Sequence, residues 1–145
     1  MANATTPRKM REVSVKSIKR VLKNASVAVE GAIACIDTTD GALVPAATAT
    51  TLIPIGYFID LGTETSVTGD GTKQVKVRLF KEVIAFWYVN DTGTPVTDAK
   101  MAQTVYLLDN QTLSANATGK SIGGRCWGVD TVKGVLCEPQ ISASL

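Results

Sequence analysis

The chain has 145 residues, of which 45% are hydrophobic, 6% aromatic and 19% charged, and its formal net charge is +2. This length fits one domain that buries a core without disulfides or a structural metal, and no apolar stretch reaches the roughly 18 residues of a membrane-spanning helix. There is no histidine, which excludes Ser-His-Asp and Cys-His catalysis and histidine metal sites.

The first predicted element is a basic segment at residues 8–23. It holds seven of the fifteen Lys and Arg residues against one acid, a local net charge of +6. Ile18, Val21 and Leu22 follow helical spacing, whereas the residues before them alternate as in a strand. We expect an extended arm over residues 1–25 with at most two helical turns, because so short a helix is unstable alone. Its cations are Arg8, Lys9, Arg11, Lys16, Lys19, Arg20 and Lys23.

Short strands and turns are predicted next. Val27 and Val29 alternate with other residues, and Gly31 interrupts the pattern before a second apolar run. We therefore expect two strands, or one strand bent at Gly31. A further strand is expected over Ile53–Leu61, where apolar and aromatic residues follow one another.

The longest strand signal covers Gln74–Val89. Its first half alternates apolar with basic residues, which predicts one solvated face. After Lys81 and Glu82 the residues are nearly all apolar. We expect a bulge or bend there, followed by a strand covered on both faces.

The last third predicts a three-stranded meander. Apolar runs at Val105–Leu108, Arg125–Val129 and Val135–Glu138 are separated by a long polar loop and by a compact turn. Gly134 lies near the end of that turn, which suits a backbone position with positive φ. The aromatic candidates for core or intersubunit packing are Trp87, Tyr88, Tyr106 and Trp127.

These signals together predict an all-β fold of seven to nine short strands. Turn signals recur about every ten residues, as in a small antiparallel β-sandwich or barrel. We expect a single β domain over residues 26–145, preceded by the extended basic arm with one short helix at most.

The final stretch has a distinctive order of strand and turn residues. It contains Val105-Tyr106-Leu107-Leu108-Asp109, a polar loop to Thr118-Gly119, Gly124-Arg125-Cys126-Trp127-Gly128-Val129-Asp130 and Gly134-Val135-Leu136-Cys137-Glu138. This order resembles the C-terminal half of tailed-phage head decoration proteins, also called capsid cement proteins. The resemblance is close over the last third and extends to the middle only in style.

The resemblance implies a structural virion protein. Such a protein is made in the host cytoplasm, binds the outer surface of the expanded phage head and stabilises it. Its implied partners are the major capsid protein and its own copies in a homotrimer, and the N-terminal region lies against the shell.

No residue pattern predicts chemistry. Gly-rich phosphate-binding motifs are absent, and the carboxylates are scattered singly through turns. Cys35, Cys126 and Cys137 lie in apolar runs without disulfide or metal spacing, so we expect buried thiols. We therefore expect no enzyme activity, catalytic residue, cofactor, metal site or membrane partner.

The basic segment has four interpretations: a solvated tail, a nucleic-acid arm, a membrane-surface helix, or a docking arm on an acidic protein surface. It lacks aromatic residues for base stacking and has few apolar anchors for a membrane. We favour the docking arm, because an arm that orders on binding covers much surface while its charge steers the encounter.

Two other functions stay open. A β-sandwich binding module for carbohydrate or a host surface, associated with a tail, would need exposed aromatic residues in a groove. A nucleic-acid-binding β-barrel would use the basic arm, and a salt-dependent shift of DNA in a gel would reveal it. We expect no specific nucleic-acid partner.

Overall fold

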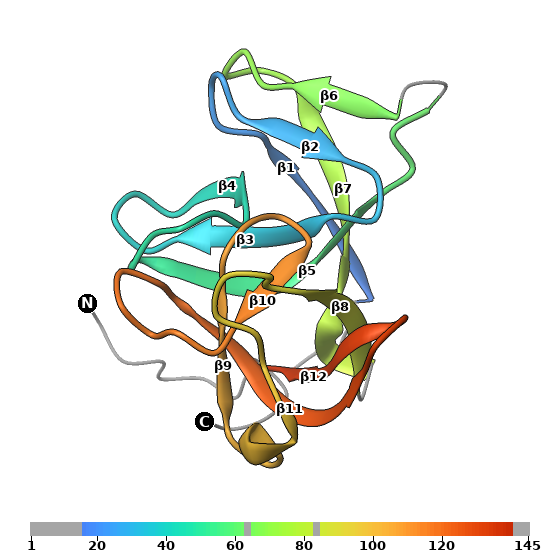
Figure 1. Cartoon of the computed structure of the whole chain (residues 1–145). Helices are drawn as coiled ribbons and strands as arrows, with labels where there is room; N and C mark the ends of the chain where they lie inside the picture. The colour runs from blue at the N-terminus through green and yellow to red at the C-terminus, as the bar shows by residue number, and fades with distance from the viewer. Residues whose placement is uncertain (1–15, 63–64, 83–84, 141–145) are drawn as a thin grey trace, which may run out of the picture.

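The computed structural model describes residues 16–62, 65–82 and 85–140, and within these ranges the protein is all-β. Its strands form a curled five-stranded sheet, a closed barrel and a two-stranded ribbon. Figure 1 shows the sheet and ribbon in the upper part of the molecule and the barrel below them. The predicted fold class, a small antiparallel β-sandwich or barrel, is confirmed.

The sheet and ribbon use the first seven strands, which are β1 (Ser17–Val21), β2 (Val27–Val29), β3 (Ile33–Asp37), β4 (Ala42–Pro45), β5 (Leu52–Ile59), β6 (Ser66–Thr68) and β7 (Gln74–Leu79). The sheet has the antiparallel order β1-β7-β5-β3-β4, and β2 pairs with β6 in the ribbon. The sheet curls until its two edges touch, where Leu22 and Leu43 form a parallel bridge. Phe58 and Val77 are fully buried inside the curl.

The barrel uses the last five strands, which are β8 (Phe86–Asn90), β9 (Thr104–Leu107), β10 (Thr112–Ser114), β11 (Ile122–Asp130) and β12 (Gly134–Pro139). Their order is β10-β8-β12-β11-β9, and β10 closes the barrel by pairing with both β8 and β9. Two 3-10 helices, η1 (Phe80–Glu82) and η2 (Asp98–Lys100), precede β8 and β9.

The predicted meander is confirmed. Strand β11 pairs antiparallel with both β9 and β12. Gly134 has a φ of 98° at the end of the β11–β12 turn. A side chain there would collide with the Tyr88 carbonyl, so both the conformation and the space require glycine.

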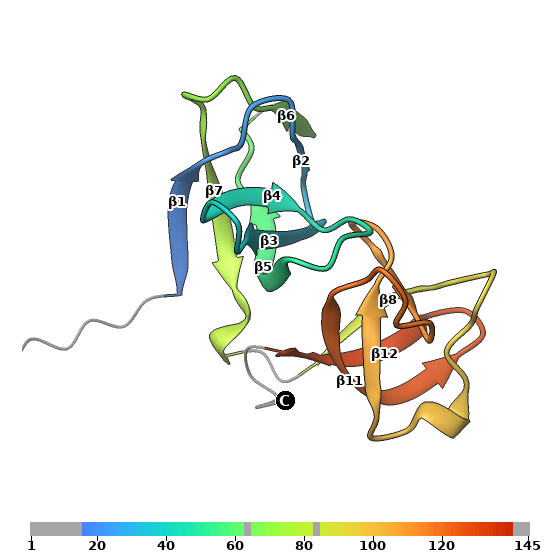
Figure 2. The same cartoon turned by 90° about the vertical axis from the view of Figure 1, so that its left-hand side faces the viewer.

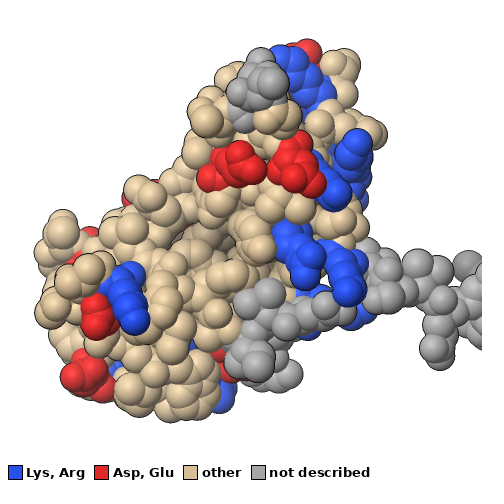
Figure 3. Space-filling view, turned by 90° about the vertical axis from the view of Figure 1, so that its right-hand side faces the viewer, with Lys and Arg blue, Asp and Glu red and all other residues tan. Residues whose placement is uncertain are grey.

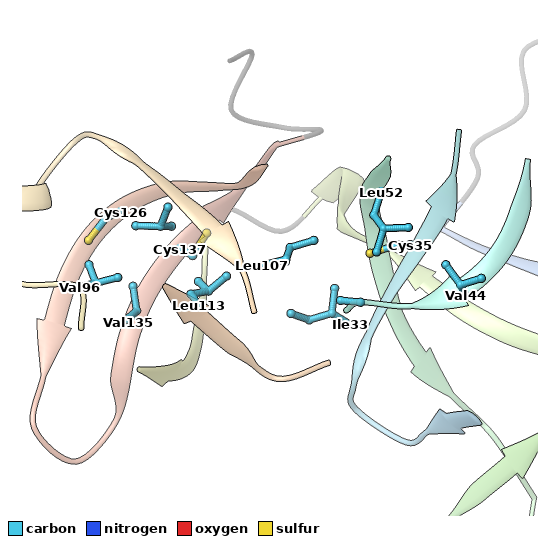
Figure 4. Close-up of a cluster of buried hydrophobic side chains, with 12 residues drawn as sticks. Ile33, Cys35, Val44, Leu52, Val96, Leu107, Leu113, Cys126, Val135 and Cys137 are labelled. Carbon is cyan, nitrogen blue, oxygen red and sulfur yellow. The ribbon is translucent and has the colours of Figure 1, made fainter. Parts of the chain in front are cut away.

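One cluster of buried side chains joins two units, the curled sheet with its ribbon and the barrel (Figure 4). Its fully or nearly buried members are Ile33, Cys35, Val44, Ala46 and Leu52 from the sheet side and Val96, Val105, Leu107, Leu113, Cys126, Val135 and Cys137 from the barrel side. Hydrogen bonds cross the same junction. The Ser121 hydroxyl donates to the Ala49 carbonyl at 2.5 Å and accepts from the Leu52 N–H at 2.9 Å. The units therefore pack against each other through a shared core.

The start of the described chain differs from the expected arm. Ser17–Val21 form β1, and each of these residues pairs with β7. From residue 16 to residue 25 the chain has no helix; Leu22 is instead fully buried at the seam, and Ile18 packs against the core of the sheet. Residues 17–22 of the predicted arm of residues 1–25 are thus part of the sheet, and residues 1–15 lie outside the described ranges.

The prediction for the region after Lys81 was correct on the bend and wrong on the burial. Helix η1 supplies the bend, and the chain passes there from the sheet into the barrel. Strand β8 is not covered on both faces, since Trp87 and Val89 are 41% and 49% exposed. The reason is that a barrel wall has only one inner face, which here receives Tyr88.

Candidate interaction surfaces

The described residues do not bring reactive side chains together. Among them, no group of three His, Cys, Asp or Glu residues is placed to hold a metal ion. Cys35, Cys126 and Cys137 are buried and unpaired. Burial raises the pKa of Cys35 and of Cys137 to about 12, and it also raises the pKa of Cys126. These thiols are protonated at neutral pH and pack as small apolar side chains.

Acidic side chains in the turns bind the backbone of those turns. Asp70 accepts a hydrogen bond from the Thr72 hydroxyl at 2.7 Å and from the N–H groups of Thr72 and Lys73 at 2.8 and 2.9 Å. These bonds lower the pKa of Asp70 to about 2. Asp130 accepts two backbone N–H groups in the β11–β12 turn, which lowers its pKa. The scattered carboxylates of the sequence thus have a local structural role.

Two of the predicted docking residues hold the seam of the curled sheet. Arg20 donates from Nη2 to the Gly41 carbonyl at 2.9 Å, and Lys23 Nζ forms a 3.0 Å ion pair with Asp40. The hydrogen bond to Asp40 raises the pKa of Lys23. Both contacts tie the end of β1 to the turn before β4, so these cations are engaged within the molecule.

Other cations gather on the outer face of β1 and β7. Lys19 lies directly opposite Lys76, and Arg78 follows two positions along on the same face. Lys76 also forms a 3.2 Å ion pair with Asp60. We call Lys19, Lys76 and Arg78 the basic face. Figure 3 shows Lys and Arg side chains gathered on the sheet side of the molecule, whereas most of the barrel surface in that view is uncharged.

The remaining predicted docking residues precede or begin β1. Lys16 is exposed, and its carbonyl accepts a hydrogen bond from the Leu79 N–H at 2.9 Å. Arg8, Lys9 and Arg11 lie outside the described ranges. Strand β1 is an edge strand that pairs with β7 along one side (Figure 2). The described part of the chain therefore begins at a sheet edge, beside the basic face, and we call residues 1–15 the leading segment.

The outer wall of the barrel carries two exposed tryptophans. Trp87 on β8 is opposite Leu136 of β12, and Trp127 lies at a bulge in β11; they are 41% and 43% exposed. Trp127 Nε1 donates to Glu138 Oε1 at 3.2 Å, and Lys133 Nζ lies 5.5 Å from the centre of the Trp87 ring. We call the following residues, which do not line the groove described below, the tryptophan wall: Trp127, Val132 and Leu136.

The four predicted aromatic residues therefore separate into two groups. Tyr88 packs against the shared core, and burial raises its pKa. Trp87 and Trp127 face outward. Tyr106 is half-buried and alternates on β9 with buried neighbours, so it also faces outward. The sequence located these aromatic residues in strands but did not distinguish the inner from the outer positions.

A groove of about 360 Å³ lies where the barrel meets the sheet. Its lining residues are Gly31, Tyr57, Phe86, Trp87, Tyr88, Val89 and Gln111. The Tyr57 and Phe86 rings meet edge-to-face with centroids 5.5 Å apart. Sequence reasoning missed this groove, because Tyr57 and Phe86 are distant in the chain and no local pattern indicates that β5 and β8 come together.

Comparisons of this chain with protein-family models, curated proteins and solved structures gave no match. Within residues 16–62, 65–82 and 85–140, no helix is long and apolar enough to cross a membrane.

Proposed function

We propose that this protein is a capsid decoration, or cement, protein that binds the outer surface of a phage head. The observation that supports this most is the presence of two exposed surfaces of different chemistry on one packed body: the basic face on the sheet and the tryptophan wall on the barrel. A protein that joins neighbours in a shell needs at least two such surfaces. The resemblance of residues 105–138 to decoration proteins suggests that the shell is a phage head.

The basic face is the surface proposed to meet the major capsid protein. Lys19 and Lys76 oppose each other directly, an arrangement that disfavours an isolated sheet because like charges repel. An acidic partner removes that repulsion and is attracted from a distance. The leading segment, with Arg8, Lys9 and Arg11, would extend the same contact along the shell.

The tryptophan wall is the surface proposed to meet other copies in a homotrimer. Tryptophan is enriched at the centres of protein interfaces, where it fills a large area with little loss of side-chain freedom. Several copies joined in this way attach to the shell at several points, which raises the overall affinity. Binding to the expanded shell then stabilises it by mass action.

The direct test mixes the purified protein with mature, undecorated phage heads and measures occupancy by imaging. The double variant Lys19→Glu/Arg78→Glu reverses charge on the basic face. A matched control, Lys100→Glu/Lys120→Glu, makes the same charge change on the barrel side of the chain. We expect the first variant to bind at least about tenfold more weakly at low salt and the control to bind normally. Equal binding of the two variants would overturn the proposal for this surface.

A truncation tests the leading segment. Removal of residues 1–23 is unsuitable, because it deletes β1 and the fully buried Leu22. Removal of residues 1–15 leaves β1 whole. The shorter chain should keep the unfolding midpoint of the full chain and lose affinity for heads. If its affinity is unchanged, the leading segment has no part in docking.

A further inference from the structure

The groove at the junction of the two units has a rigid aromatic lining. Tyr57 comes from β5 of the sheet, and Phe86, Trp87 and Tyr88 come from β8 of the barrel. The Phe86 ring lies 5.5 Å from Tyr57, 5.1 Å from Phe80 and 6.1 Å from Tyr88, measured between centroids. Because these rings support one another, the groove is formed before any ligand arrives. Its volume of about 360 Å³ is within the range of small-ligand sites.

The groove offers polar groups that carry no formal charge. The lining residues whose side chains carry such groups are Tyr57 and Tyr88 with a hydroxyl, Trp87 with an indole N–H and Gln111 with an amide. Among the described residues, none of these four groups has a hydrogen-bond partner in the protein. Among the residues that the structure describes, no Lys, Arg, Asp or Glu lines the groove. Lys133, which lies over the Trp87 ring, lines a neighbouring hollow instead.

We propose that this groove binds a neutral saccharide. A sugar ring has an apolar face of C–H groups that packs on an aromatic ring, and its hydroxyls both donate and accept hydrogen bonds. Trp87, which is 41% exposed, supplies the stacking surface, and Gln111 supplies an amide that donates and accepts. A nucleotide or an acidic peptide would find no opposite charge in this lining, so the uncharged lining favours an uncharged ligand.

The chain allows a direct optical test, because it has two tryptophans and only Trp87 lines the groove. Trp127→Phe leaves Trp87 as the sole indole, and Trp87→Phe leaves Trp127, which is almost equally exposed, as the matched control. Both variants are titrated with maltotriose, cellotriose and the trimer of N-acetylglucosamine. We expect at least one trisaccharide to shift the emission of Trp87 with saturation in the millimolar range, about −4 kcal/mol at 1 mM, and to leave the emission of Trp127 unchanged.

Two further variants identify the contacts by calorimetry. Trp87→Ala should weaken binding of that trisaccharide at least about tenfold, since the stacking surface is lost. Gln111→Ala, an exposed position before β10, should weaken it by a smaller factor, about two- to tenfold, since one hydrogen-bonding group is lost. Trp127→Ala should bind as the unaltered protein does.

Three results would overturn the proposal. One is that none of the trisaccharides changes the emission of Trp87 at concentrations up to about 20 mM. Another is an equal response from both single-tryptophan variants. The third is that the emission of Trp87 changes with protein concentration while sedimentation shows self-association. A second copy of the chain would then occupy the groove. The titration needs no phage head, so its failure is separate from a failure of the proposed docking function.

Discussion

The curled sheet closes at a single backbone bridge with charged side chains beside it, whereas the barrel closes by pairing of whole strands. In the sheet, the edges touch at that bridge, and Arg20 of β1 and Lys23, just after β1, reinforce it. In the barrel, β10 pairs with the strands on both sides. The comparison shows that Arg20 and Lys23 of the basic segment make structural contacts, and that a fully paired barrel can expose apolar side chains on its outer wall.

The two regions are nevertheless not independent, because one cluster of buried apolar side chains spans their junction. Ile33 and Cys35 from the sheet and Leu113 and Cys137 from the barrel belong to one cluster. A surface on the sheet is thus held in a fixed relation to a surface on the barrel.

The thiols should report the shared core with the largest change. Burial raises the pKa of Cys35 in the sheet and Cys137 in the barrel from 9.0 to about 12, which lowers the thiolate fraction at mildly alkaline pH roughly a thousandfold. Labelling with a thiol reagent should therefore be slow in the native protein and fast in urea, with both cysteines becoming reactive together. Selective early labelling of either site would show that one unit opens alone.

Core substitutions should lower the stability of both units together. Leu22 belongs to the core of the sheet and Leu113 to the shared core, and both are fully buried. We expect Leu22→Ala and Leu113→Ala each to cost about 2–5 kcal/mol in the free energy of unfolding. Because Trp87 and Trp127 lie in the barrel, tryptophan fluorescence reports that unit and circular dichroism reports both.

For Leu22→Ala, the urea midpoint measured by tryptophan fluorescence and the midpoint measured by circular dichroism should fall by the same amount. A fluorescence midpoint that stays at its original value while the dichroism midpoint falls would contradict the shared core. The nearly fully exposed Val132 supplies the control, since Val132→Ala should leave both midpoints in place.

Some of this architecture could be predicted from sequence, because it depends on local residues. Gly31 separates β2 from β3, and Gly134 ends the hairpin before β12, as their positive φ angles require. The pairing of β1 with β7 could not be predicted, because the partners are more than fifty residues apart and an amphipathic run of five residues is ambiguous. The same holds for β10, whose three residues lie in a segment that looked like a polar loop.

The surfaces were predicted less well than the strands. The cations of residues 8–23 were identified as a group, but no local pattern indicates that Arg20 and Lys23 contact the β3–β4 turn. Outward positions for Trp87 and Trp127 depend on the register of β12 and on the bulge in β11, which are tertiary features.

Low pH should lower the free energy of unfolding, because protonation of the turn carboxylates removes the hydrogen bonds that they accept. The folded pKa of Asp70 is about 2, below its usual value of 3.8. Its contribution to stability is therefore complete above pH 3.8 and is lost as the pH falls toward 2. In Asp70→Asn, the urea midpoint should fall less between about pH 5 and 2 than in the unaltered protein. An identical pH dependence in both proteins would show that the Asp70 bonds do not persist in solution.

Substitution of Lys19 and of Lys23, both in the predicted arm, should affect the stability of the protein differently. Lys23→Ala removes the ion pair to Asp40 at the seam and should lower the urea midpoint slightly. Lys19→Ala removes the repulsion with Lys76 and should leave the midpoint unchanged or raise it by an amount corresponding to a few tenths of a kcal/mol. A loss of stability from Lys19→Ala equal to that from Lys23→Ala would remove the distinction between structural and binding cations.

The most direct test of two separate binding surfaces is a titration of undecorated phage heads with three variants. One carries Lys19→Glu/Arg78→Glu on the basic face, one carries Trp127→Ser/Val132→Ser on the tryptophan wall, and one combines all four changes. Each double variant should lose occupancy while keeping its native dichroism spectrum, and the combined variant should lose more than either. Full occupancy by either double variant would contradict the account, because one surface would then be sufficient for attachment.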